Sequence, residues 1–82
     1  MSFAGEIKRN REQFLREMYT IADGRFGVLI DSYELGEKYR FDWETLETIV
    51  EYLEAKGLIA SYQGTLFASL TLNGVEYVEN IE

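Results

Sequence analysis

The chain has 82 residues, enough for one small domain with a single core, and its 15 acidic and 8 basic residues give a net charge of −7. It contains neither cysteine nor histidine. Their absence excludes disulfides and thiolate metal sites, and it removes the commonest general base and the commonest metal ligand. A hydrophobic fraction of 46% is too high for a disordered chain, so we expect a single folded domain over residues 1–82.

Motifs that carry enzymatic chemistry are missing from the sequence. There is no phosphate-cradling glycine loop, dinucleotide fingerprint or calcium loop, and the serines have no histidine to activate them. We therefore expect no enzymatic activity, no catalytic residues, no cofactor and no metal site. No apolar run approaches the roughly 18 residues needed to cross a bilayer, and the first residues lack the apolar stretch of a signal peptide. We expect a cytoplasmic protein without membrane contact.

The first predicted element is an amphipathic helix over residues 6–22, in which apolar side chains recur at helical spacing and which Gly24 ends. The start of this helix carries the only dense basic cluster of the chain, formed by Lys8, Arg9 and Arg11. A solvent-facing helix surface is the simpler interpretation of such a short run of charge. A phosphate-binding patch is the alternative.

Two short elements follow the first helix. The apolar run at residues 28–30 predicts a small strand. Asp31, with Glu34 three residues later, resembles a capping box and predicts a helix over residues 32–39. Gly36 lies inside that helix, where glycine costs about 1 kcal/mol relative to alanine. We therefore expect the next helix to approach closely at this position.

The most regular pattern predicts a helix over residues 43–56. Asp42 is suited to its N-cap, because a carboxylate there accepts from free amides of the first turn. Gly57 occupies the position after the helix where a left-handed conformation is needed. The apolar side chains at offsets of three, four and seven form one stripe along the helix: Leu46, Ile49, Val50 and Leu53.

The remaining residues predict a hairpin and a last helix. Two β-prone runs at residues 58–62 and 65–70 flank a two-residue Gln-Gly loop. Thr71 is then placed to cap a helix over residues 72–80. We expect the apolar side chains of this helix to pack on the first helix: Leu72, Val75 and Val78.

The order and spacing of these elements resemble the helix-turn-helix core of the winged-helix superfamily over about residues 6–80. The resemblance is carried by Leu35-Gly36, the turn around Arg40, the apolar stripe of the third helix, Gly57-Leu58-Ile59 and Leu70-Thr71-Leu72-Asn73-Gly74. It implies an α+β winged-helix fold, with a three-helix helix-turn-helix core, a small antiparallel wing hairpin and a short C-terminal helix. The same scaffold serves DNA binding and protein contact, so the resemblance leaves the function open.

In the winged-helix family the third helix is the recognition helix, and here its outer side is acidic. At 100° per residue, Glu44, Glu47, Glu51 and Glu54 lie within an arc of about 80°. In a major groove these carboxylates would approach a surface that carries one phosphate charge per ~1.7 Å. The expected wing, residues 58–71, contains no lysine or arginine for backbone contacts. This distribution of charge favours a protein partner over DNA.

We therefore predict a non-enzymatic interaction or regulatory module whose third helix contacts a protein partner or a second copy. Tyr52 is expected on the outer side of the third helix and Tyr62 at the wing tip, since aromatic residues are enriched in interface cores. A homodimer through the first and last helices is a second mode of association, and surface drift in an acidic protein is an alternative explanation of the glutamates. The candidate partner-binding residues are Glu44, Glu47, Thr48, Glu51, Tyr52, Glu54 and Tyr62.

The alternative function is a DNA-binding transcriptional regulator of the winged-helix type. A single glutamate in the major groove can accept from cytosine, so one acidic contact does not exclude this function. Four glutamates without balancing bases would be unusual for it. The candidate phosphate contacts are Lys8, Arg9, Arg11, Arg25, Lys38 and Arg40.

Overall fold

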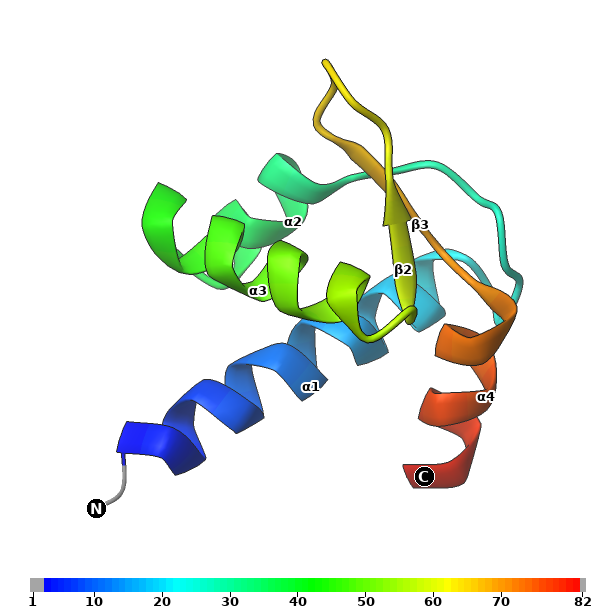
Figure 1. Ribbon diagram of the computed structural model, residues 1–82, viewed down its shortest axis with the longest axis horizontal. Coiled ribbons are helices and arrows are strands. Elements are labelled where there is room, and N and C mark those ends of the chain that lie inside the picture. The colour runs from blue at the N-terminus through cyan, green and yellow to red at the C-terminus, as the bar shows by residue number, and fades with distance from the viewer. Residues whose placement is uncertain (1–2, 82) are drawn as a thin grey trace.

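The computed structural model describes residues 3–81, which form an α+β arrangement of four helices and one small antiparallel sheet (Figure 1). The sheet has three strands in the order β1-β3-β2, so the strand that ends the hairpin lies in the centre. In chain order the elements are α1 (Phe3–Ile21), β1 (Ile30–Asp31), α2 (Ser32–Lys38), α3 (Trp43–Ala55), β2 (Ile59–Ser61), β3 (Phe67–Leu70) and α4 (Leu72–Ile81). None of the described helices is long and apolar enough to cross a membrane.

The core forms where the second half of α1 meets α3, α4 and the sheet. Five side chains are almost completely removed from solvent: Phe14, Leu15, Met18, Leu70 and Val78. Burying a side chain of this size contributes about 1.5–3 kcal/mol. On α3 the predicted stripe faces this core, with Leu46, Ile49 and Leu53 buried and Val50 partly buried. The helical periodicity of the sequence therefore identified the correct face of α3.

Aspartate side chains cap both helices of the α2–turn–α3 unit, as the sequence predicted. The Asp31 carboxylate accepts from the backbone N–H of Glu34 at 3.1 Å. The Asp42 carboxylate accepts from the N–H of Thr45 at 2.8 Å, and this backbone hydrogen bond lowers the pKa of Asp42 below its usual value. These caps fix where α2 and α3 begin, because each satisfies an amide that the helix leaves free.

The two helices pack closely where the sequence has a glycine. A Cβ at Gly36 would lie 3.0 Å from both methyl carbons of Leu46, which confirms the packing reason expected for this residue. Arg40 adopts a left-handed backbone with φ of 59° in the turn between the helices. The missing side chain of Gly36 and the left-handed conformation of Arg40 thus allow a short connection between α2 and α3.

The end of α3 redirects the chain into the sheet. Gly57, with φ of 75°, donates its N–H to the Glu54 carbonyl at 2.9 Å, and Leu58 donates to the Leu53 carbonyl at 3.0 Å. This pair of bonds is a Schellman motif, which satisfies carbonyls that the helix leaves free. The chain leaves the motif directly into β2, so α3 and the hairpin are held side by side (Figure 1).

The start of α4 is held against the same corner. Thr71 caps the helix by accepting from the Gly74 N–H at 3.0 Å, and its hydroxyl donates to the Gly57 carbonyl at 2.6 Å. A Cβ at Gly74 would lie 2.0 Å from the Leu58 carbonyl oxygen. Only glycine therefore fits at this position without moving the backbone, which explains the Leu-Thr-x-x-Gly pattern of the sequence in physical terms.

Three predictions about local structure were inaccurate. The first strand is Ile30–Asp31 rather than residues 28–30, because backbone pairing with β3 begins only at Ile30 and Leu29 is exposed. The hairpin connection is longer than two residues, since β2 ends at Ser61 and β3 begins at Phe67. Leu72 does not pack on α1, because it lies in the first turn of α4 with its side chain 54% exposed.

Candidate functional site

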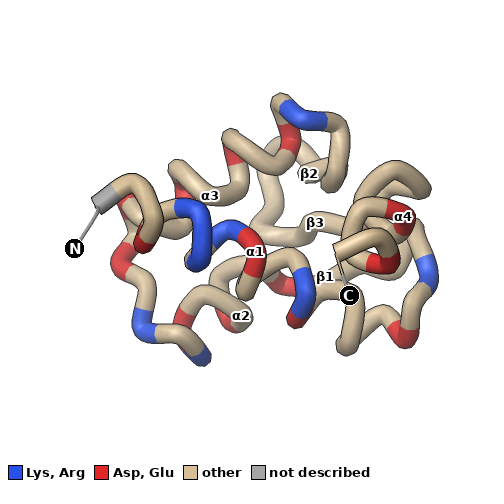
Figure 2. Tube along the Cα trace, turned by 90° about the horizontal axis from the view of Figure 1, so that it is seen from below, with Lys and Arg blue, Asp and Glu red and all other residues tan. Residues whose placement is uncertain are grey.

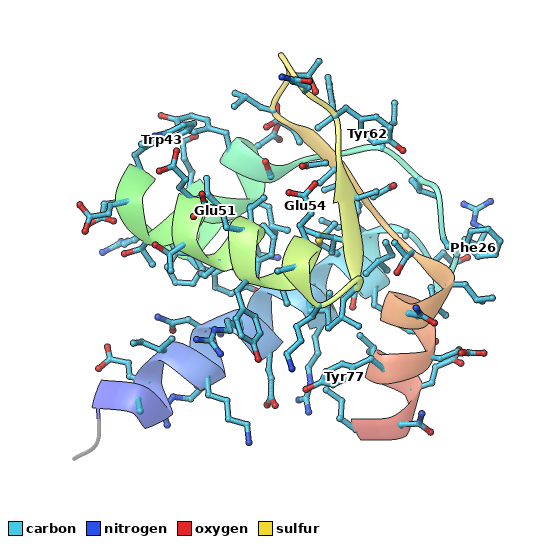
Figure 3. All side chains as sticks on the ribbon, viewed as in Figure 1. Phe26, Trp43, Glu51, Glu54, Tyr62 and Tyr77 are labelled. Atoms are coloured by element: carbon cyan, nitrogen blue, oxygen red, sulfur yellow. The ribbon has the colours of Figure 1, made fainter. Side chains whose placement is uncertain are left out.

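A shallow hollow of about 280 Å³ lies between the outer side of α3 and the β2–β3 hairpin. Figure 3 shows Trp43 and Glu51 on the α3 side of this region and Tyr62 on the hairpin. We call this region the acidic face. It is lined by Ser32, Trp43, Leu46, Glu47, Val50, Glu51, Glu54, Ser61, Tyr62, Gln63, Gly64, Thr65, Leu66 and Phe67.

The charge of the acidic face comes from α3. Glu47 and Glu51 are exposed, and among residues 3–81 neither carboxylate has a hydrogen-bond or ion-pair partner. Glu54 accepts from the hydroxyl of Ser61 at 2.6 Å, so it also ties α3 to β2. No lysine or arginine lines the hollow. Two carboxylates are therefore available to a partner, and a third is shared with the fold.

Two predicted partner-binding residues of α3 lie away from the hollow. Glu44 is exposed in the first turn of α3, and its backbone carbonyl accepts from the hydroxyl of Thr48 at 2.9 Å. Both residues line a separate small depression against the start of α1. The hydroxyl of Thr48 is thus already used within its own helix, and neither Glu44 nor Thr48 is part of the acidic face.

Tyr52 is not on the outer side of α3, where the sequence analysis placed it. The guanidinium carbon of Arg11 lies 3.5 Å from the centre of the Tyr52 ring, and the Lys56 ammonium lies 5.8 Å from it. The ring therefore faces α1. The reason is helix geometry: Tyr52 follows the buried Ile49 by three residues, so it borders the buried stripe on the side that faces α1.

Tyr62 begins the hairpin loop and is among the residues that line the hollow, but Figure 3 shows its side chain pointing away from α3. Its side chain is 43% exposed, and its hydroxyl lies 3.2 Å from the hydroxyl of Ser69, which is buried. Ser32, the other buried serine, donates its hydroxyl to the Leu66 carbonyl at 2.6 Å. Both buried serines therefore hold the hairpin in place, and neither is paired with a group that could activate it as a nucleophile.

Exposed apolar side chains border the glutamates, and sequence reasoning did not identify all of them as site residues. Trp43 is 54% exposed at the start of α3, and its ring centre lies 6.2 Å from that of Tyr33 on α2. Leu66 and Phe67 are each 44% exposed on the hairpin. Leu66 and Phe67 were hard to identify from the sequence, because exposure does not alternate along β3. One exposed position is followed there by three buried ones.

The six basic residues of the DNA-binding alternative do not gather on one surface. Arg11 packs on Tyr52, and Lys8 and Arg9 are exposed at the start of α1. Arg25 lies beyond the other end of α1, where its side chain donates to the Ala22 carbonyl at 3.2 Å. Figure 2 shows acidic positions spaced along α3 and basic positions along α1.

The remaining two basic candidates are the last residue of α2, Lys38, and Arg40 in the turn that follows. Lys38 pairs with Glu17 on α1 at 2.5 Å, and Tyr39 donates to the other oxygen of the same carboxylate at 3.1 Å. The hydrogen bond to Lys38 lowers the pKa of Glu17, and the same bond raises the pKa of Lys38. Arg40 is exposed in the turn. Lys38 is thus engaged within the chain, which leaves Arg40 alone near the start of α3.

The described part of the chain contains no group of three or more acidic, histidine or cysteine residues placed to hold a metal ion. Comparison with protein-family models, with curated proteins and with solved structures gives no significant match. Functional evidence therefore comes from the geometry of the molecule itself. The strongest such feature is the combination of free carboxylates and exposed aromatic side chains on the acidic face.

Proposed function

We propose that this protein is a non-enzymatic winged-helix interaction module whose acidic face binds a basic segment of a protein partner. In this assignment α1, α2 and α3 form the helix-turn-helix core, β2 and β3 form the wing, and α4 closes the domain. The two capped helices of the α2–turn–α3 unit and the hairpin that directly follows α3 support it. The observation that carries the function is the acidic face, where no basic residue lines the hollow.

The composition of the acidic face suits a basic and partly apolar partner. Glu47 and Glu51 can attract lysine or arginine, which gives orientation and speeds association. Trp43, Leu66 and Phe67 supply apolar area that a partner can cover, since contiguous exposed apolar groups mark contact sites. The charged and apolar groups lie around one hollow, so a short segment of a partner could contact both kinds of group.

DNA is a poorer fit to the same face. A duplex would place phosphates near the carboxylates of α3, and counterion release would gain little because few basic residues could replace the counterions. Of the six candidate phosphate contacts, Arg11, Lys38 and Arg25 contact Tyr52, Glu17 and Ala22. Lys8 and Arg9 lie at the start of α1, and only Arg40 is exposed near the start of α3. We therefore prefer the protein-binding function and keep DNA binding as an outcome to be tested.

A homodimer through α1 and α4 stays a prediction. Val75 and Val78 are buried within their own chain, and Tyr19 of α1 donates to Glu79 of α4 at 2.9 Å. The apolar side of α4 is therefore satisfied without exchange. A dimer would have to use the exposed side of α1, and sedimentation at high micromolar concentration can detect it.

The proposed function can be tested by reversing charge on the acidic face. We expect the double variant Glu47→Lys/Glu51→Lys to lose partners that the wild-type protein captures from the native cell extract, as measured by quantitative mass spectrometry. The matched control is Glu37→Lys/Glu76→Lys, which changes the net charge equally at exposed positions outside the hollow. Equal capture by both variants would show that the acidic face is not the binding surface.

A separate measurement of affinity for duplex DNA distinguishes protein binding from DNA binding. At ~0.15 M salt the wild-type protein should bind duplex DNA no better than the ~10⁻⁴ M limit of non-specific affinity. A selected duplex that binds at ~10⁻⁸ M or tighter, with lower affinity and a lower salt slope for Arg40→Ala, would identify a DNA reader instead.

A further inference from the structure

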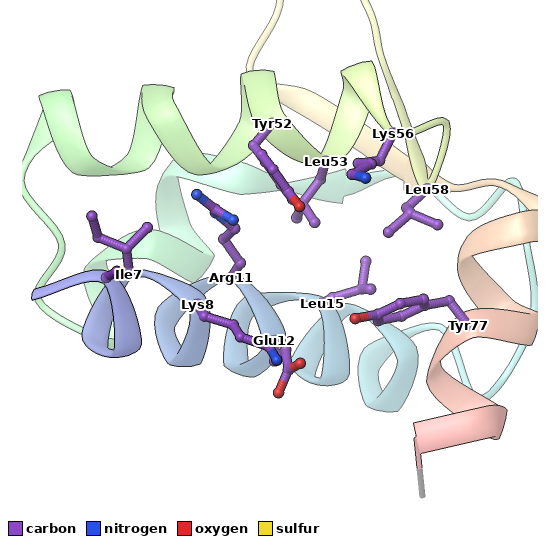
Figure 4. Close-up of a pocket in the computed structure, with 11 residues that line it drawn as sticks. Ile7, Lys8, Arg11, Glu12, Leu15, Tyr52, Leu53, Lys56, Leu58 and Tyr77 are labelled. Carbon is purple, nitrogen blue, oxygen red and sulfur yellow. The ribbon is translucent and has the colours of Figure 1, made fainter. Parts of the chain in front are cut away.

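A second and larger hollow lies on the other flank of α3, enclosed by α1, α3 and α4 (Figure 4). We call it the α1–α4 groove. Its volume of about 580 Å³ falls within the roughly 300–1,000 Å³ of sites that hold small organic ligands. The groove shares no lining residue with the acidic face. It is therefore a separate candidate site, which the proposed function does not use.

The inner surface of the α1–α4 groove is apolar. Leu15 and Leu53 are buried side chains of the core, and the partly buried Leu58 lies beside them. Tyr52 from α3 and Tyr77 from α4 form opposite parts of the wall, with Tyr77 pointing toward Leu15 in Figure 4. Leu15 and Leu53 are already removed from solvent, so the apolar surface from which a ligand could displace water comes from Leu58 and the two tyrosines.

The rim of the α1–α4 groove is cationic although the chain as a whole is acidic. Lys8, Arg11 and Lys56 line the groove, and Glu12 is the only carboxylate among the lining residues. Lys8 and Glu12 lie at its outer edge in Figure 4. Lys56 comes from the end of α3, so folding brings it to cations that are far away in the sequence. The groove therefore carries three positive charges against one negative charge.

Arg11 and Lys56 are placed around one aromatic ring. The guanidinium carbon of Arg11 lies 3.5 Å from the centre of the Tyr52 ring, and the Lys56 ammonium lies 5.8 Å from the same centre. The Arg11 Nε is buried and has no hydrogen-bond partner among the described residues. A buried donor without an acceptor is unfavourable. Because this Nε is buried, a ligand can approach Arg11 only through its terminal amino groups.

We propose that the α1–α4 groove binds an amphiphilic carboxylate, such as a medium-chain fatty acid. Its apolar body lies along Leu58 and Tyr77, and its carboxylate lies at the rim beside Lys56, on the other side of the Tyr52 ring from Arg11. The cations favour an anion, the apolar walls favour a hydrophobic body, and a volume of about 580 Å³ accommodates a small molecule. A neutral lipid would leave the cations without a partner, and a simple inorganic anion would leave the apolar surface wet.

The test uses decanoate as the probe, below the concentration at which it forms micelles, with decanol as its uncharged analogue. Binding to the full chain is followed by amide chemical shifts in nuclear magnetic resonance spectra. We expect decanoate to shift the signals of Leu58 and Tyr77, and decanol to bind about tenfold more weakly. Equal affinity for both compounds, or no shifts at these residues, would overturn the proposal.

Variants of the cations sharpen the test. Lys56→Gln should weaken decanoate binding about tenfold and leave decanol binding unchanged, because it removes a charge-assisted contact. Arg11→Gln should weaken it less, because the Arg11 charge lies behind the Tyr52 ring. The matched control is Arg9→Gln, since Arg9 lies on α1 but does not line the groove. Thermal melts of all three variants check that they remain folded, and Lys56, which is exposed, keeps the test valid if Arg11→Gln unfolds. Weakening by Arg9→Gln equal to that by Lys56→Gln would overturn the proposal.

A second copy of the chain is the competing occupant of the groove. Sedimentation of the wild-type protein and of Lys56→Gln distinguishes the two cases. We expect both proteins to sediment as monomers with or without decanoate. A wild-type dimer that dissociates in Lys56→Gln would assign the groove to self-association and would overturn the ligand site.

Discussion

The two flanks of α3 carry opposite charge and acquire it in different ways. On the acidic face, Glu47 and Glu51 come from α3 itself, at spacings that the helical period places together. In the α1–α4 groove, Arg11 comes from α1 and Lys56 from the end of α3. Net charge is therefore a poor guide to the charge of a local site, because a chain of charge −7 still forms a cationic groove.

The apolar environments of the two flanks differ as well. On the acidic face the apolar groups are exposed, with Trp43 at 54% and Phe67 at 44%. In the groove they are part of the core or adjoin it, as with Leu15 and Leu53. The first arrangement suits a broad contact with another protein, and the second suits a small ligand that is partly enclosed.

The largest expected effect comes from removing a side chain that supports both flanks. Leu53 lies on the buried side of α3 and is 2% exposed. Leu53→Ala should lower the free energy of unfolding by about 2–5 kcal/mol, through lost burial and the cavity left behind. Because a small domain has only about 5–15 kcal/mol in total, both sites should be lost or weakened together. A thermal melt measures the change.

Leu72→Ala is the matched control for this prediction, since Leu72 is 54% exposed. It should change the free energy of unfolding by no more than about 0.5 kcal/mol. A melt of Leu53→Ala that coincides with the wild type would mean that the buried face of α3 is assigned incorrectly.

A smaller effect should separate the two flanks. A Cβ at Gly74 would meet the Leu58 carbonyl at 2.0 Å, so Gly74→Ala must displace α4 from the α3–β2 corner. Overpacking of this kind costs typically about 1–3 kcal/mol. Because α4 forms a wall of the groove and no part of the acidic face, decanoate binding should weaken more than partner binding.

Urea denaturation and the two binding assays measure these effects of Gly74→Ala. Asn73→Ala, at an exposed neighbouring position, serves as the control and should behave as the wild type. Equal loss of both binding activities would argue that the two flanks are not independent.

The smallest effect concerns a charge pair that lies on neither flank. The hydrogen bond from Lys38 lowers the pKa of Glu17 below its ordinary value of 4.5. A carboxyl whose pKa is lower in the folded state stabilises the fold above its unfolded pKa and loses that contribution as the pH falls through its folded pKa. Stability should therefore decrease below about pH 4.5, and only slightly, because the pair is exposed.

Urea midpoints measured between neutral pH and acid pH test this prediction. Glu17→Gln should reduce the acid sensitivity, and the remaining decrease should include the contribution of Asp42, whose pKa is also lowered. Identical pH profiles for Glu17→Gln and the wild type would show that the pair does not contribute to folding.

Most helices and the charge of the acidic face could be predicted from local patterns in the sequence. Apolar spacing predicted the buried side of α3, and the caps Asp42 and Thr71 are those expected from their positions. The left-handed Gly57 also ends α3 as predicted. These features depend on groups within a few residues of one another, so a local pattern is sufficient to predict them.

Contacts between residues that are distant in the sequence could not be predicted from local patterns and were found only in the folded chain. Pairing with β3 placed the first strand at Ile30, and packing against α1 turned Tyr52 away from the acidic face. The α1–α4 groove brings Arg11 and Lys56 to the same aromatic ring, although 45 positions separate them in the chain. Strand register and the convergence of side chains from different helices depend on contacts between separate elements, and no local periodicity of the sequence contains that information.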